Sequence, residues 1–146
     1  MRITQKAPRK SRPCAPSFAD TFYFIALLDR RDARHTMAIA ESRVTDRRFM
    51  TTEQVLIELG DALHKPGARS EFAAIVHLVQ TDPAWEVLSS STSLFKRALD
   101  IYRRHRDKEW QMTDCLSFAT MRQLHLREAL TGDHHFEQAG FKALLH

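Results

Sequence analysis

The chain has 146 residues, of which 43% are hydrophobic and 27% are charged, a composition typical of one globular domain rather than of a disordered chain. Its net charge of +4 is compatible with a polyanionic partner, and its two cysteines are too few for a disulfide framework or a cysteine-based zinc site, as expected in a reducing compartment. The longest apolar run, residues 22–28, is too short to cross a bilayer and no secretory signal is recognisable, so we expect a cytoplasmic protein with no membrane contact.

The first 16 residues are basic and contain three prolines, with no apolar periodicity. Such a segment buries too little apolar surface to order itself, so we expect a flexible N-terminal tail at residues 1–16 and one folded domain at residues 17–146. The tail is either an extension without a role or an arm that contacts RNA phosphates or a partner protein.

From residue 17 onward, short apolar segments alternate with amphipathic ones. Strands are expected at residues 18–19, 47–51, 85–88, 128–131 and 141–145. Helices are expected at residues 21–29, 33–42, 52–65, 68–81, from the serine cluster 89–93 to about 104, at 113–126, and for one or two turns after Asp133. This alternation predicts an α/β fold with a mostly parallel sheet and helices on both faces. No glycine lies in a phosphate-binding loop, so a nucleotide cofactor has no support.

Four acidic residues occupy positions that such a fold brings together. Asp20 directly follows the first strand, Asp133 follows the strand at 128–131, and Asp114 begins the helix at 113–126. Glu58 lies on the flank of the apolar stripe of the third helix. Because the carboxyl ends of parallel strands meet at one edge of a sheet, we expect these side chains to converge.

Carboxylates without histidine or cysteine ligands suit hard divalent cations such as Mg²⁺ or Mn²⁺. A bound cation relieves the repulsion among such carboxylates, activates water and stabilises charge on a phosphoryl oxygen, as in nucleases. Each acid also has a simpler explanation: Asp20 as a helix N-cap, Asp114 as a first-turn acid, Glu58 as a solvated residue and Asp133 as part of a Gly-Asp turn. Their shared placement favours a common site.

The segments around these acids resemble motifs of the PIN-domain ribonucleases. SFADT at residues 17–21, leading to ALLD at 26–29, is similar to the opening motif, and TTEQVLIE at 51–58 to the segment of the second acid. TDCLSF at 113–118 is similar to the third-acid motif, and LTGDHHF at 130–136, followed by AGF at 139–141, to the fourth. The resemblance covers about residues 17–145, with the motifs in the family's order. One departure is Phe22, where many members carry a small polar residue.

The resemblance implies a PIN-like three-layer sandwich and a metal-dependent endoribonuclease, most like the VapC toxins of bacterial type II toxin–antitoxin systems. It also implies Mg²⁺ or Mn²⁺ as the cofactor, an RNA substrate left with 5′-phosphate and 3′-hydroxyl ends, inhibition by a cognate antitoxin protein, and a homodimer. The implied metal ligands and catalytic residues are Asp20, Glu58 and Asp114, completed by Asp133, with hydroxyl support from Thr21 and Thr131.

Two other functions compete with this interpretation. A non-catalytic RNA- or protein-binding module with the same fold would be expected to have lost at least one of the four acids. A receiver- or phosphatase-like domain phosphorylated on Asp20 is disfavoured, because Asp20 is not part of an Asp-x-Asp pair. The RNA target stays open at this stage, since specificity in such folds lies in loops and surface charge.

Overall fold

The computed structural model describes residues 15–146, so the expected tail at residues 1–16 falls almost entirely outside the described part of the chain. The strands are β1 (Ser17–Ala19), β2 (Phe49–Thr52), β3 (Trp85–Leu88), β4 (Glu128–Leu130) and β5 (Lys142–Ala143). The helices are α1 (Thr21–Leu28), α2 (His35–Ser42), α3 (Glu53–Ala62), α4 (Arg69–Thr81), α5 (Thr92–Arg104), α6 (Met112–Gln123) and α7 (His134–Gln138).

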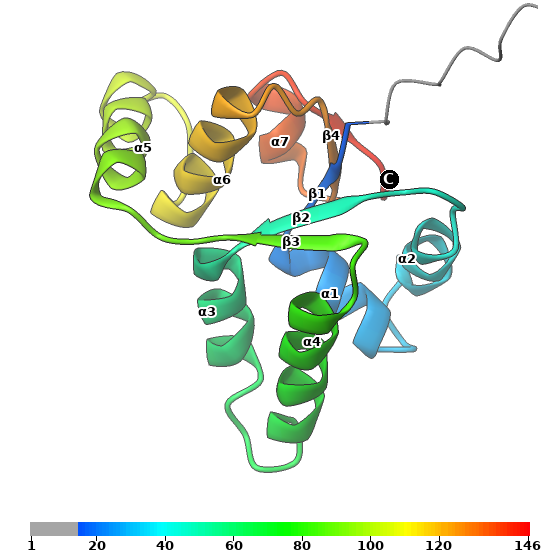
Figure 1. The fold of residues 1–146 in the computed structure, drawn as a ribbon. Helices are drawn as coiled ribbons and strands as arrows, with labels where there is room; N and C mark the ends of the chain where they lie inside the picture. Colours follow the sequence, from blue (N-terminus) through cyan, green and yellow to red (C-terminus); the bar gives the residue numbers. More distant parts are fainter. Residues whose placement is uncertain (1–14) are drawn as a thin grey trace, which may run out of the picture.

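The strands form one five-stranded sheet in the order β3-β2-β1-β4-β5, and every neighbouring pair is parallel. Helices α1 to α4 lie on one face of the sheet and α5 to α7 on the other (Figure 1). The expected α/β sandwich with helices on both faces is therefore confirmed, and the sheet is entirely parallel rather than mostly so. Among residues 15–146, no helix combines the length and the apolar character that a membrane span requires.

Aromatic side chains fill the core on both sides of the sheet. On one side Phe49 stacks on Trp85, with ring centroids 4.6 Å apart, and on the other Phe118 meets Phe136 edge-on at 5.0 Å. Helix α6 is buried continuously from Cys115 to Met121, as expected for a central helix that is apolar on most sides. Burial of each large apolar side chain contributes about 1.5–3 kcal/mol, so this core holds the sheet and α6 in a fixed relation.

Some element boundaries differ from the expected ones for local reasons. Helix α6 ends at Gln123 rather than at residue 126, because His125 adopts a left-handed backbone with φ of 54°. Helix α3 ends at Ala62, before the Pro66-Gly67 pair. Thr52 is the N-cap of α3, because its hydroxyl accepts the Val55 N–H at 3.2 Å.

The sheet order positions the functional edge. The chain leaves β1 toward β2 and β3, then returns to place β4 on the other side of β1. The gap between the carboxyl ends of β1 and β4 is therefore the point where the strand order reverses, which is where open α/β sheets bind ligands. Asp20 directly follows β1 and Thr131 directly follows β4.

Candidate active site

A cavity of about 440 Å³ opens at this point of reversal. All four sequence candidates, Asp20, Glu58, Asp114 and Asp133, line it, together with a fifth acid, Asp32. The structure therefore brings together residues that are more than a hundred positions apart in the chain, from the ends of β1 and β4 and from helices α3 and α6.

Asp20 is the most deeply placed acid, with only 9% of its surface exposed. It occupies the N-cap position of α1 but its side chain makes no capping hydrogen bond, so the simple N-cap explanation fails. Instead, its Oδ2 accepts a hydrogen bond from the Thr131 hydroxyl at 3.1 Å. Burial, followed by the nearby negative charges of Glu58 and Asp114, raises the pKa of Asp20 to about 7, against the opposing effect of the Thr21 N–H and the Thr131 hydroxyl.

Glu58 is oriented from a different helix. The Thr21 hydroxyl at the start of α1 donates a hydrogen bond of 2.7 Å to Glu58 Oε2. Val55 and Leu59 on the same helix are buried, and they anchor the face of α3 that turns Glu58 toward the cavity. Both threonines implied as hydroxyl support, Thr21 and Thr131, thus donate to candidate acids.

Asp114 is held by the start of its own helix. Its Oδ2 accepts the backbone N–H of Gln111 at 2.9 Å, as part of a capping box at the N-terminus of α6. Burial and the neighbouring charges of Asp133 and Glu58 raise its pKa, while the Gln111 N–H and His135 oppose that rise. The first-turn explanation for Asp114 is therefore correct, and it also fixes the carboxylate in the cavity.

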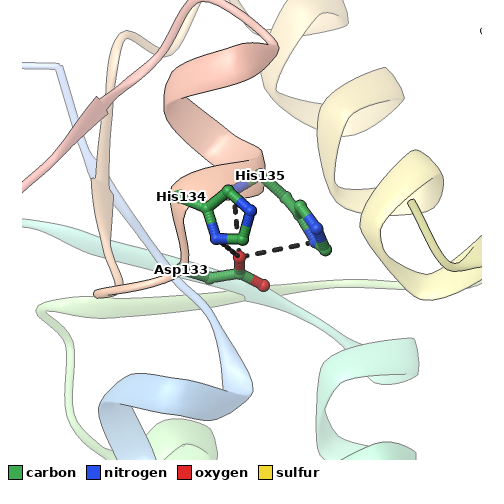
Figure 2. A group of neighbouring side chains, drawn as sticks. All are labelled: Asp133, His134 and His135. Atoms are coloured by element: carbon green, nitrogen blue, oxygen red, sulfur yellow. Dashed lines mark hydrogen bonds and ion pairs between the residues drawn. The ribbon is translucent and has the colours of Figure 1, made fainter. Parts of the chain in front are cut away.

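Asp133 caps α7 and lies beside two imidazoles (Figure 2). Its Oδ1 accepts the His135 N–H at 2.9 Å, while its own N–H donates to the Thr131 hydroxyl at 3.1 Å. His135 Nδ1 stands 3.4 Å from Asp133 Oδ1 and 3.3 Å from Asp114 Oδ2, so this ring bridges two acids. His134 Nδ1 is 3.7 Å from Asp133, but its side chain is 72% exposed.

Sequence reasoning missed three polar residues that line the cavity, namely Asp32, Gln111 and His135. The contacts of His135 with Asp133 and Asp114 place this side chain as support for the turn after β4. Its position two residues after the fourth acid was the available signal. Asp32 lies in a charged connection, where its Oδ1 accepts the Arg34 N–H at 2.7 Å, and nothing in the spacing pointed to the cavity.

Comparison with known proteins decides the family. The family model of the PIN domain matches residues 17–142, which is most of the chain. The chain belongs to the PIN-domain family.

Within that family the chain is VapC-like. It is 30% identical over 125 residues to the 23S rRNA-specific endonuclease VapC20 of Mycobacterium tuberculosis, in two strains, and the match covers 85% of this chain and 94% of the relative. The crystal structure of VapC20, described as a sarcin–ricin loop cleaving toxin, superposes with a TM-score of 0.77 at 27% identity, over 85% of this chain and 95% of that one. The expected resemblance to VapC toxins is confirmed.

A second solved structure shares the architecture. FitAcB of Neisseria gonorrhoeae matches with a TM-score of 0.60 at 16% identity, over 87% of this chain and 95% of that one. At this level of identity the likeness shows the fold alone.

The donors in this PIN domain fit a divalent cation. Five carboxylates line one cavity, and burial, followed by the negative charges of Glu58 and Asp114, raises the pKa of the most buried of them, Asp20, to about 7. Asp133, His134 and His135 also offer ligand atoms that all lie within 4.8 Å of one another. Oxygen-rich sites of this kind suit hard cations, in agreement with a metal-dependent activity.

Proposed function

We propose that this PIN domain is a VapC-type toxin that hydrolyses RNA phosphodiester bonds with Mg²⁺ or Mn²⁺. The observation that carries the proposal is the convergence of Asp20, Glu58, Asp114 and Asp133 in one cavity at the reversal point of the sheet. The similarity over most of the chain to a 23S rRNA-specific endonuclease supports it.

When bound, the cation would activate water and stabilise charge on the phosphoryl oxygens of the cleaved bond. Asp20, Glu58 and Asp114 would hold it, with Asp133 completing the cluster. The side chains are aligned in advance: Thr131 holds Asp20, Thr21 holds Glu58, and the Gln111 N–H holds Asp114. Such support keeps ligands in place and adds to affinity and rate in known metal sites.

The substrate we propose is a loop of ribosomal RNA. The relative is named as specific for 23S rRNA, and its structure is described as cleaving the sarcin–ricin loop. Sequence-specific RNA recognition favours single-stranded loops, where bases are free to leave the stack. Hydrolysis would leave a 5′-phosphate and a 3′-hydroxyl.

We further propose that the protein forms a homodimer and that a cognate antitoxin inhibits it by covering the acidic cavity. Both follow from the likeness to VapC toxins. A non-catalytic binding module would be favoured by acids that diverge, and here Asp20 and Asp114 line the same cavity.

The test is cleavage of purified total RNA by the antitoxin-free protein with Mg²⁺ or Mn²⁺, with Asp114→Asn beside the wild type. Discrete fragments with 5′-phosphate ends that disappear with EDTA and with the variant are expected, and mapping their ends names the loop. A folded wild-type protein that cleaves no RNA with either ion would contradict the proposal.

A further inference from the structure

The acidic cavity cannot by itself attract RNA. Among residues 15–146, five carboxylates line it when Asp32 is included, and His135 is the only basic side chain in the lining. RNA carries one negative charge per nucleotide, and proteins gain affinity for it by neutralising phosphates with lysine and arginine. If the proposed function is right, on which this inference rests, cations near the cavity must hold the flanking nucleotides.

A second cavity, of about 550 Å³, lies between the end of α5 and the connection to α6. Arg103, Arg106 and Lys108 line it, against one carboxylate, Glu109. Within residues 15–146 neither Arg103 nor Arg106 forms an ion pair, so both charges are available to a ligand. We call this hollow the basic cavity.

The neighbouring Arg104 differs in both respects. It does not line the basic cavity, and its guanidinium is 3.1 Å from the carboxylate of Asp100 one helical turn away. In this segment, therefore, Arg104 is paired within its own helix, whereas Arg103 and Arg106 line the basic cavity.

The basic cavity also has an aromatic wall. Tyr102 on α5 is 49% exposed and lines it. Trp110 forms a fixed part of the wall, because its indole N–H donates to Gln138 Oε1 at 2.9 Å and its ring lies 5.0 Å from Phe118. Aromatic faces beside arginines are the combination that binds single-stranded RNA, by stacking and by phosphate contact.

Two residues adjacent in the sequence connect the linings of the basic and acidic cavities. Trp110 lines the first, and Gln111, whose N–H holds Asp114, lines the second. Arg106 is five positions before Gln111, which limits their separation to roughly 17 Å along an extended chain. Helices α5 and α6 lie side by side on one face of the sheet (Figure 1). One strand of RNA can thus occupy both hollows.

We propose that the basic cavity is a subsite for single-stranded RNA that flanks the cleaved bond. Arg103 and Arg106 bind backbone phosphates, and Tyr102 stacks on a base. The acids then act on a strand that is already held a few nucleotides away.

The experiment measures binding of a short fluorescent single-stranded RNA to the full chain carrying Asp114→Asn, which prevents cleavage. In that background, changing both Arg103 and Arg106 to Ala is expected to weaken binding about tenfold or more and to reduce the slope of log K against log salt by about 1.4, for two lost phosphate contacts. Tyr102→Ala is expected to weaken binding and Tyr102→Phe to preserve it, because only the ring is needed. Arg104→Ala is the matched control and should leave affinity within about twofold, as expected for an arginine in an exposed ion pair.

An unchanged affinity and salt slope in the double variant would overturn the subsite, as would an equal loss in Arg104→Ala. The subsite would also be overturned if the double variant lost affinity for an acidic peptide but kept its affinity for the RNA. That result would favour a protein partner for the basic cavity. Cleavage assays with Asp114 restored separate the two proposals. Equal cleavage by the wild type and the double variant rejects the subsite alone, whereas absence of cleavage by the wild type rejects the nuclease.

Discussion

The hydroxyl of Thr131 joins the two strand ends that form the site. It donates to Asp20 Oδ2 at 3.1 Å and accepts the backbone N–H of Asp133 at 3.1 Å. Thr131 is fully buried, so these bonds form away from competing water. One side chain thus fixes an acid after β1 relative to an acid after β4.

Replacing Thr131 by Val keeps the shape of the side chain and removes both hydrogen bonds. We expect RNA cleavage to fall about 10- to 100-fold, as for other residues that orient metal ligands. The unpaired Asp133 N–H should also cost about 1–3 kcal/mol of folding free energy. Thr120→Val is the control, because Thr120 is equally buried but donates only to Leu116 O within α6. Equal losses of cleavage in both variants would show that the Thr131 contacts have no special part.

The raised pKa of Asp20 predicts a pH-dependent stability without metal. Its pKa is about 7 in the folded protein and near the ordinary 3.8 when unfolded, so folding favours the protonated acid. The stability that this proton provides is complete below pH 4 and is lost as the pH rises through 7. Asp20→Asn removes the charge, and we expect its gain in stability over the wild type to be larger at pH 8 than at pH 5, by about 2–3 kcal/mol.

Thermal unfolding in EDTA at the two pH values measures this difference. A divalent cation should reverse the trend for the wild type and raise its Tm more at pH 8, where Asp20 is ionised, than at pH 5. If Asp20→Asn changed Tm by the same amount at both pH values, the carboxyl group of Asp20 would already be charged at pH 5 as well as at pH 8.

Phe22 and Gly132 pack too closely for a larger residue at 132. A Cβ at this position would lie 2.6 Å from the Phe22 ring and 2.6 Å from the backbone oxygen of Leu145. We expect Gly132→Ala to cost about 1–3 kcal/mol and to lower cleavage, because Phe22 lines the acidic cavity. At Gly67 an added Cβ meets nothing within 4 Å, so Gly67→Ala should be neutral or slightly stabilising in urea unfolding. A fully active and stable Gly132→Ala variant would contradict this packing.

The meeting of Asp20 and Asp133 could be predicted because each follows a strand, and parallel strands end at the same edge. The role of His135 could not, because its ring reaches Asp114 only through the direction of its side chain from the first turn of α7. Likewise Gln111 holds Asp114 through its backbone N–H, and because almost any residue type has this group, the sequence does not reveal the contact. Helix ends such as that of α6 depend on a single backbone angle at His125.

The last strand shows the same limit. Residues 141–145 were expected to form it, whereas β5 covers only Lys142–Ala143. The N–H groups of Leu144 and Leu145 still donate to Ala129 O and Thr131 O, so the chain continues to follow β4 without completing a strand. The apolar pattern predicted burial correctly and could not predict where regular pairing stops.

The most direct test of the central claim compares Glu58→Gln with Asp61→Asn in cleavage of ribosomal RNA with Mg²⁺ or Mn²⁺. Both acids lie on α3, but Glu58 lines the acidic cavity and accepts the Thr21 hydroxyl, whereas Asp61 is exposed outside it. If the cavity is a metal-dependent nuclease site, Glu58→Gln should lower cleavage at least about 100-fold with the fold intact, as loss of a group that stabilises transition-state charge does, while Asp61→Asn cleaves like the wild type. Equal cleavage by the two variants would contradict the account.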